Sequence, residues 1–180
     1  MKTENEQIVK ACLDNDPLAQ KQLYDRFAPV MLSVCVRYMG NFEDAQDVLQ
    51  DGFVKVFSHL HQLKDVVQLR SWIERIMVNT AISALRKRNE RLSIDEVDPA
   101  TEELTVDCDF SRYDVEQIMK AIKSLPRVQR ITFNMREVEG YPDDEIAKKL
   151  GITEVTVRSN ASRARQQLIA KLAQIGLDKE

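Results

Sequence analysis

Six basic side chains and a single acid, Glu154, lie between residues 148 and 171. The bases are Lys148, Lys149, Arg158, Arg163, Arg165 and Lys171. Small polar residues separate the arginines, and such a mixture suits DNA recognition, since cations bind phosphates and short side chains let a helix approach base edges in the major groove. The predicted chemistry is therefore noncovalent reading of DNA. The alternative is a solvated helix face that carries arginines only for solubility.

These side chains need a helix-turn-helix to present them, and residues 141–172 have that pattern. Pro142 and the three acids that follow it suit a helix start, Gly151 suits its end, and Thr153 can cap a second helix. The second helix has an apolar stripe formed by Val157, Ala161, Ala164, Leu168 and Leu172. The residues predicted to face DNA from this helix are Thr156, Arg158, Ser159, Asn160, Ser162, Arg163 and Arg165.

A second basic row lies in residues 70–91. Polar and basic residues recur there at helical spacing behind an aromatic one: Trp72, Arg75, Asn79, Ser83 and Arg86, followed by Lys87 and Arg88. An aromatic ring that leads a basic row suits strand separation or single-strand binding, because bases stack on the ring. The alternative is that the terminal bases only complement the dipole of the helix end.

The preceding helix, residues 42–60, carries acids outside its apolar face. Asp44 and Asp47 near its start are explained by the helix dipole. Asp51 is not, because like charges four residues apart destabilise a helix by a few tenths of a kcal/mol. A protein partner with a basic surface would explain this acidic face.

The periodicity predicts helices throughout and no strand. In the first half they begin at Asp16, with a kink or short break at Pro29, at Asn41 and near Ser71. Four more follow, one of them with an apolar face running from Val128 to Val138. We therefore predict an all-α protein with two small helical domains, residues 1–91 and 112–180, joined by a flexible acidic linker at residues 92–111.

Composition excludes several classes of protein. No apolar run is long enough to cross a membrane and the N-terminus lacks the apolar core of a secretory signal, so we expect a cytoplasmic protein. Cys12, Cys35 and Cys108 show no CxxC pairing, and buried free thiols are expected at the first two. No constellation of His, Cys or paired acids has the spacing of a catalytic or metal site, so we expect neither an enzyme nor a cofactor.

In this order, the motifs resemble a known family: the chain is similar to sigma-70 family RNA polymerase sigma factors of the extracytoplasmic-function group. EDAQDVLQDGFVKVF resembles the segment that docks on the polymerase clamp, and SWIERIMVNTAISALRKRNER resembles the minus-10 recognition helix. The segment from residue 124 to 168 resembles the minus-35 reader. The resemblance implies binding to core RNA polymerase and promoter DNA, and makes an anti-sigma factor a plausible partner.

Residue by residue, the resemblance places Asp47, Gln50, Asp51 and Phe53 in the docking segment, beside Asp44. It sets the row that ends at Arg88 against minus-10 DNA, the loop at residues 61–69 around a flipped base, and the second helix of the motif in the minus-35 major groove. Ser83, Pro142 and Val155 depart from the usual Asp, Ser and Gly of the family. The competing hypothesis is a two-domain helix-turn-helix regulator that binds operators without polymerase.

Overall fold

The computed structural model describes residues 2–88 and 115–177. These residues are helical, with no strand among them, and fall into two compact units, unit 1 within Met1–Arg88 and unit 2 within Asn89–Glu180. The predicted all-α class with two helical units is confirmed. The acidic linker predicted at residues 92–111 lies outside the described residues. None of the described helices is both long and apolar enough to cross a membrane.

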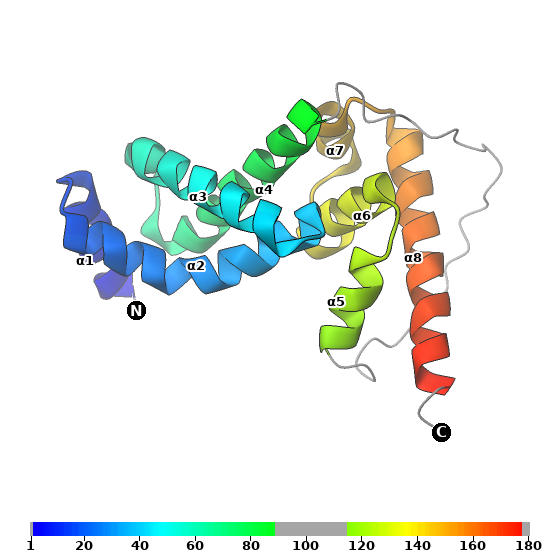
Figure 1. Ribbon diagram of the computed structural model, residues 1–180. Coiled ribbons are helices and arrows are strands. Elements are labelled where there is room, and N and C mark those ends of the chain that lie inside the picture. Colours follow the sequence, from blue (N-terminus) through cyan, green and yellow to red (C-terminus); the bar gives the residue numbers. More distant parts are fainter. Residues whose placement is uncertain (1, 89–114, 178–180) are drawn as a thin grey trace. The chain divides into compact units, whose positions relative to one another are not determined.

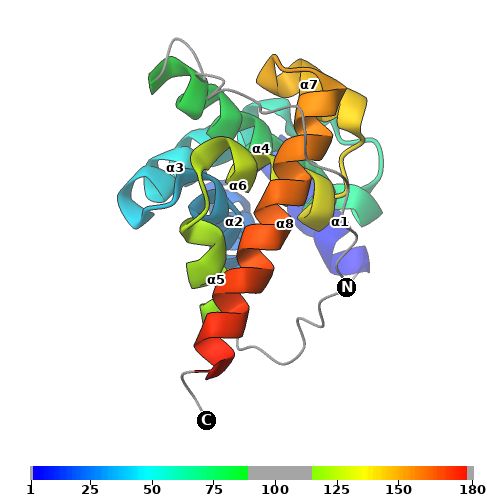
Figure 2. The same ribbon diagram turned by 90° about the vertical axis from the view of Figure 1, so that its right-hand side faces the viewer.

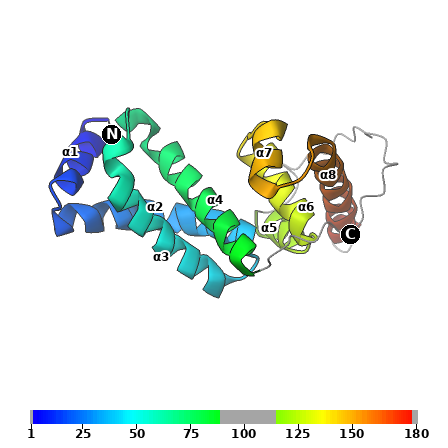
Figure 3. The ribbon, with the colours of Figure 1, turned by 90° about the horizontal axis from the view of Figure 1, so that it is seen from above.

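Unit 1 is built around α2 (Pro17–Met39), which packs against α3 (Phe42–His59) and α4 (Leu69–Arg88). Figure 3 shows α3 and α4 extending across α2, and α1 (Lys2–Leu13) at the N-terminal end of α2. Two short 3-10 turns, η1 (Leu60–Gln62) and η2 (Val66–Gln68), connect α3 to α4 and contact α1. The predicted helix at residues 71–88 thus begins two residues earlier, at Leu69.

Local signals at the helix ends act as predicted. Asp16 caps α2 by accepting the Leu18 N–H at 2.8 Å, Gly40 ends it in a left-handed conformation, and Asn41 caps α3 by accepting the Asp44 N–H at 2.8 Å. The break considered at Pro29 does not occur, since α2 is one continuous helix. Its packing against three other helices outweighs the single hydrogen bond that proline removes.

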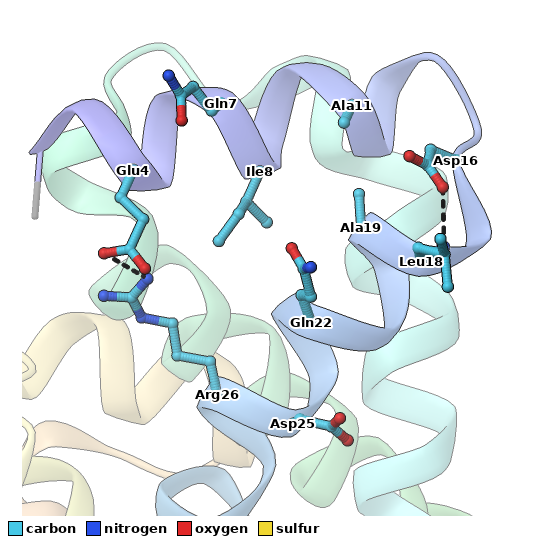
Figure 4. A pocket seen from close by; sticks show the side chains of 10 residues that line it. All are labelled: Glu4, Gln7, Ile8, Ala11, Asp16, Leu18, Ala19, Gln22, Asp25 and Arg26. Carbon is cyan, nitrogen blue, oxygen red and sulfur yellow. Dashed lines mark hydrogen bonds and ion pairs between the residues drawn. The ribbon is translucent and has the colours of Figure 1, made fainter.

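The helix α1 was not predicted from the sequence. Its apolar positions are few and weakly periodic, but Val9 is 6% and Cys12 is 5% exposed, so the helix buries one narrow face. Figure 4 shows the cleft that α1 and α2 line beside this contact. Its charged side chains are engaged within unit 1: Glu4 pairs with Arg26 at 3.4 Å, Asp16 caps α2, and Asp25 pairs with Lys21. The cleft is therefore part of the joint between the two helices.

Unit 2 contains α5 (Val115–Lys123), α6 (Arg127–Phe133), α7 (Asp143–Leu150) and α8 (Glu154–Leu177), the four helices predicted. Figures 1 and 2 show α8 running past the other three, with α7 at its N-terminal end and α5 towards its C-terminal end. The predicted stripe of α8, from Val157 to Leu172, is fully buried, with each member at most 1% exposed.

The helix α6 continues into a π-helical turn, η4 (Asn134–Val138). The Glu139 N–H reaches back five residues to the carbonyl of Asn134 at 2.9 Å. A π turn rotates the following side chains away from the α-helical register. Met135 stays buried, but Val138 is 49% exposed, so the prediction that it belongs to the apolar face is wrong.

The helix-turn-helix has the expected ends. Gly151 ends α7 with a positive φ of 71°, and the Thr153 hydroxyl accepts the Thr156 N–H at 3.1 Å at the start of α8. Pro142 differs slightly from the prediction, since it is the residue before the first helical position, which Asp143 occupies.

Candidate nucleic-acid interface

The basic row on α4 is exposed on the side away from the core of unit 1. Arg75, Asn79, Ser83, Arg86 and Lys87 are exposed, and Trp72 is half-buried at the start of the row. The opposite side of the helix buries residues such as Ile73, Met77 and Leu85. The helix therefore separates its apolar and polar faces as the spacing predicts. The side chain of Arg88 lies outside the described residues.

Members of the row differ in how their polar groups are used. The Ser83 hydroxyl donates to the Asn79 carbonyl at 2.8 Å, so it satisfies the backbone of its own helix. Arg86 and Lys87 form no ion pair with an acid in the part of the chain that the structure describes, and their charge remains available to phosphates.

The acidic face on α3 is also exposed. Asp47, Gln50 and Asp51 are exposed, and Val54, which is 69% exposed, lies one turn further on. Asp44 has a local role, because it accepts a hydrogen bond from the Asn41 side chain at 2.7 Å and is half-buried. An acidic surface of this kind suits a protein partner whose facing surface is basic, because opposite charges attract across an interface.

Phe53 does not belong to this exposed face. Its side chain is 2% exposed, and its ring lies 4.6 Å from that of Tyr24 and 6.0 Å from that of Phe57, measured between centroids. The expectation that it contacts a partner is therefore corrected: Phe53 packs α3 onto α2. It stands two residues from Asp51, on the opposite side of the helix.

A shallow pocket of about 410 Å³ adjoins the acidic face between α2 and α3. Its lining includes Gln46, Leu49 and Gln50 from α3 and Pro29 and Leu32 from α2. The sequence does not indicate this pocket, because its walls come from two helices and helical periodicity does not give the distance between them.

A close crossing fixes α3 and α4 relative to each other. A Cβ atom on Gly52 would overlap Met77 Sδ, so glycine is what allows this approach. Lys55 Nζ donates to the Thr80 hydroxyl at 3.1 Å across the same pair of helices. The acidic face of α3 and the basic row of α4 are therefore carried by two helices in direct contact within unit 1.

The outer side of α8 carries the second group of predicted DNA contacts. Thr156, Arg158, Ser159, Ser162, Arg163 and Arg165 are all half-buried rather than fully exposed. Arg158 pairs with Glu154 one turn earlier at 3.6 Å and with Asp143 of α7 at 3.5 Å. The guanidinium of Arg158 is thus held by acids of α7 and α8.

The prediction that Asn160 faces DNA is corrected for the same reason as that for Phe53, namely burial. It lies three residues after Val157 and four before Ala164, which places it beside the buried stripe, and it is 9% exposed. It therefore faces the core of unit 2 rather than a DNA groove.

Burial shifts the pKa of a cysteine thiol and of an arginine. Cys12 and Cys35 are buried free thiols, as predicted, and burial raises the pKa of Cys35 to about 12. Burial, and secondarily the charge of Arg127, lowers the pKa of Arg130, whose Nη1 donates to the Lys123 carbonyl at 3.0 Å. Cys108 lies outside the described residues.

Comparison with protein families gives two matches. Residues 23–91 match the model of sigma-70 region 2, and residues 115–168 match that of sigma-70 region 4. Together these matches cover more than half of the chain. The first includes both the acidic face and the basic row of unit 1, and the second includes the helix-turn-helix.

Individual proteins similar to this chain belong to the same family. The chain is 26% identical to the RNA polymerase sigma-H factor of Pseudomonas aeruginosa over 178 residues, which is 92% of each protein. It is 26% identical to the ECF RNA polymerase sigma factor SigM of Mycobacterium tuberculosis, over 91% of this chain and 82% of that protein. Its fold is similar to that of the sigma factor RpoE of Bartonella quintana, solved in complex with the anti-sigma factor NepR, with a TM-score of 0.53, 23% identity, and coverage of 85% of this chain and 96% of that one.

Proposed function

Because this chain belongs to the sigma-70 family of RNA polymerase sigma factors, in the extracytoplasmic-function group, we propose a division of labour between its two units. Unit 1 docks on core RNA polymerase and engages the minus-10 region. Unit 2 binds the minus-35 element. Promoter-specific initiation results when both contacts are made at once.

The observation that carries the proposal is the arrangement on unit 1. Asp47, Gln50 and Asp51 on α3 form an exposed acidic face, and α4, pinned to α3 at Gly52, presents an exposed basic row. A basic surface of the polymerase is attracted to the first, and the phosphates of the opened promoter are attracted to the second. The half-buried ring of Trp72 adds a stacking surface for an unpaired base.

Unit 2 fixes the position of the protein along the promoter. Arg158, Ser159, Ser162, Arg163 and Arg165 lie on the outer side of α8, and Thr156 stands at its start. A recognition helix of this kind enters the major groove with its N-terminal residues near base edges. The segment at residues 92–111 then acts as the tether between a domain at residues 1–91 and one at residues 112–180.

The same function has consequences for partners and location. A sigma factor supplies specificity to polymerase, so we propose no catalysis by this chain itself and a cytoplasmic site of action. The solved relative from Bartonella quintana was captured with an anti-sigma factor. We propose that an inhibitor of the same class holds this chain too.

The rival hypothesis, an operator-binding regulator that acts without polymerase, is not favoured. It requires a sensor or dimerisation module in the first half of the chain, where residues 23–91 instead match sigma-70 region 2. It also leaves the acidic face of α3 without a purpose.

Reconstitution with purified core RNA polymerase tests the proposal. The chain should co-purify with core enzyme, and the assembled complex should start transcripts at defined positions on genomic DNA templates where core alone does not. Sequencing the transcript starts would reveal both promoter elements. If the chain neither binds core nor directs initiation, the proposal fails.

A further inference from the structure

A single carboxylate, that of Asp143, joins three elements of unit 2. Its Oδ1 accepts Arg136 Nε of η4 at 3.1 Å, and its Oδ2 lies 3.5 Å from Arg158 Nη1 of α8. Asp143 itself is the first residue of α7, and its side chain is 20% exposed. The two arginines are less covered, with 32% and 41% of their side chains exposed.

The π-helical turn creates this junction. After η4 the Tyr141 N–H bonds to the Met135 carbonyl at 2.8 Å, and Gly140 turns the chain with a φ of 70°. The chain therefore returns towards η4 just before α7 begins, which brings Asp143 beside Arg136. Pro142 contributes no side-chain cap, and the carboxylate of Asp143 faces the two arginines.

The contacts use only part of the Arg158 guanidinium. Asp143 and Glu154 both approach Nη1, at 3.5 and 3.6 Å, and within the described residues Nη2 and Nε form no further ion pair or hydrogen bond. Two donors of one guanidinium form the fork that binds the O6 and N7 of guanine. Arg158 therefore keeps a base-reading fork while its other end is held by acids.

We propose that Asp143 is a positioning residue that sets the base preference of this helix-turn-helix by fixing the guanidinium of Arg158. The inference rests on the proposed function of unit 2 in binding the minus-35 element. A fixed side chain loses less conformational freedom on binding, and it rejects a mismatched base because it does not swing to another acceptor. Arg136 holds the second oxygen of Asp143 and so keeps the carboxylate aimed at Arg158.

A negative charge beside DNA has a second effect, which the test must separate from the first. Asp143 also repels phosphates, so its removal raises affinity for every sequence alike. Loss of positioning instead lowers discrimination at the base pair that Arg158 contacts. Base preference at each position, rather than affinity, is thus the diagnostic measurement.

Asp144 provides a matched control. It lies in the same first turn of α7, and its carboxylate pairs with Lys148 at 3.2 Å rather than with Arg158. Asp144→Asn removes the same charge from nearly the same place. Repulsion of phosphates changes similarly in the two variants, but the contact with Arg158 is lost only in Asp143→Asn.

The experiment uses the full chain assembled with core RNA polymerase, and promoters in which the minus-35 element is randomised. Relative initiation is counted for the wild type, Asp143→Asn, Asp144→Asn, Arg158→Ala and the double variant Asp143→Asn with Arg158→Ala. Asp143→Asn should weaken preference about two- to fivefold at the positions that Arg158→Ala affects, a range that corresponds to an exposed ion pair. It should add nothing in the Arg158→Ala background, and Asp144→Asn should leave preference unchanged.

The other outcomes overturn the inference. A uniform gain for all sequences in Asp143→Asn would mean that the carboxylate acts only by repulsion. A change that persists without Arg158, or an Arg158→Ala variant with unaltered preference, would remove Arg158 as the residue that is positioned. If the wild type shows no preference in the minus-35 element, the proposed function of unit 2 fails as well. Circular dichroism of each variant checks that unit 2 stays folded.

Discussion

Unit 1 carries its acidic and basic surfaces on two different helices, whereas unit 2 brings acids and arginines into direct contact within the helix-turn-helix. In unit 1, α3 carries the acidic face and α4 carries the basic row. The crossing at Gly52 and Met77 brings these two helices close together. In unit 2, Asp143 and Glu154 pair with Arg158. The first arrangement depends on buried packing, and the second on partly exposed ion pairs.

Under the proposed function, the difference follows from what each unit binds. Two partners of opposite charge require two surfaces that do not neutralise each other, and a tightly packed helix pair keeps them separate. A base-reading helix needs a few donors in fixed directions, which ion pairing at its N-terminal end provides. Packing in unit 1 and pairing in unit 2 should therefore respond to different substitutions.

The largest expected effect is on core polymerase binding. Reversing two charges of the acidic face, Asp47→Lys with Asp51→Lys, places like charges against a basic partner, which costs several kcal/mol. Affinity for core enzyme, measured by fluorescence anisotropy, should fall by at least about a hundredfold. Binding of the full chain to minus-35 DNA should not weaken.

Glu6 and Asp14 offer a control with the same change in net charge. Both are exposed in unit 1, away from α3. Their reversal to Lys should leave core affinity near that of the wild type. Equal losses in the two double variants would attribute the effect to net charge and remove the α3 surface from the docking site.

A smaller loss is expected when the crossing in unit 1 is disturbed. In Gly52→Ala the added methyl group meets Met77 Sδ in a fully buried position, and overpacking of this kind costs about 1 to 3 kcal/mol. Denaturant unfolding followed by the fluorescence of Trp72, the single tryptophan of the chain, reports on unit 1 alone. Gln46→Ala, on the exposed side of the same helix, serves as the control and should unfold like the wild type.

Replacing the capping residues tests whether the stability of each unit depends equally on its helix caps. Asp16 caps α2 at 2.8 Å and Thr153 caps α8 at 3.1 Å, and replacing either with Ala should destabilise its own unit by about 1 kcal/mol. Differential scanning calorimetry of the full chain should show a lower transition for one unit and an unchanged one for the other. A shift of both transitions in either variant would mean that the units unfold together.

Those caps also show what the sequence alone could predict. The caps that begin α2, α3 and α8, the glycines that end α2 and α7, and the buried stripe from Val157 to Leu172 depend on residues within a few positions of one another, and these were predicted. The row from Trp72 to Lys87 was predicted for the same reason. A helical period places such residues on one face whatever the rest of the fold does.

Features that depend on residues distant in sequence were missed or misplaced. Phe53 and Asn160 match motif positions, but packing against α2 and against the core of unit 2 buries them. Val138 was assigned to an apolar face that the π turn rotates outward. The pairing of Arg136 with Asp143 depends on that same turn, so no spacing rule could have indicated it.

The smallest expected effects come from replacing one of two lysines. Lys55 lies at the packed crossing of unit 1, and Lys148 belongs to an exposed ion pair of unit 2. Lys55 joins α3 to α4 through the hydroxyl of Thr80, which is 3% exposed and itself donates to the Ile76 carbonyl at 2.8 Å. Lys148 pairs with Asp144 along one exposed helix face, where 79% and 53% of the two side chains are accessible. Lys55→Ala should lower the free energy of unfolding of unit 1 by about 1 kcal/mol, because an acceptor in a buried crossing loses its donor.

Lys148→Ala should cost unit 2 no more than about 0.5 kcal/mol, since exposed pairs at this spacing contribute little, and that cost should vanish in 1 M salt. The effect of Lys55→Ala should persist in salt, because the bond lies against the α3 and α4 crossing rather than in open solvent. Calorimetry at low and high ionic strength measures both. If salt reduces the effects of both substitutions equally, the contact between Lys55 and Thr80 is electrostatic and exposed to solvent, like the pair of Lys148 and Asp144. The contrast between buried packing in unit 1 and ion pairing in unit 2 would then fail.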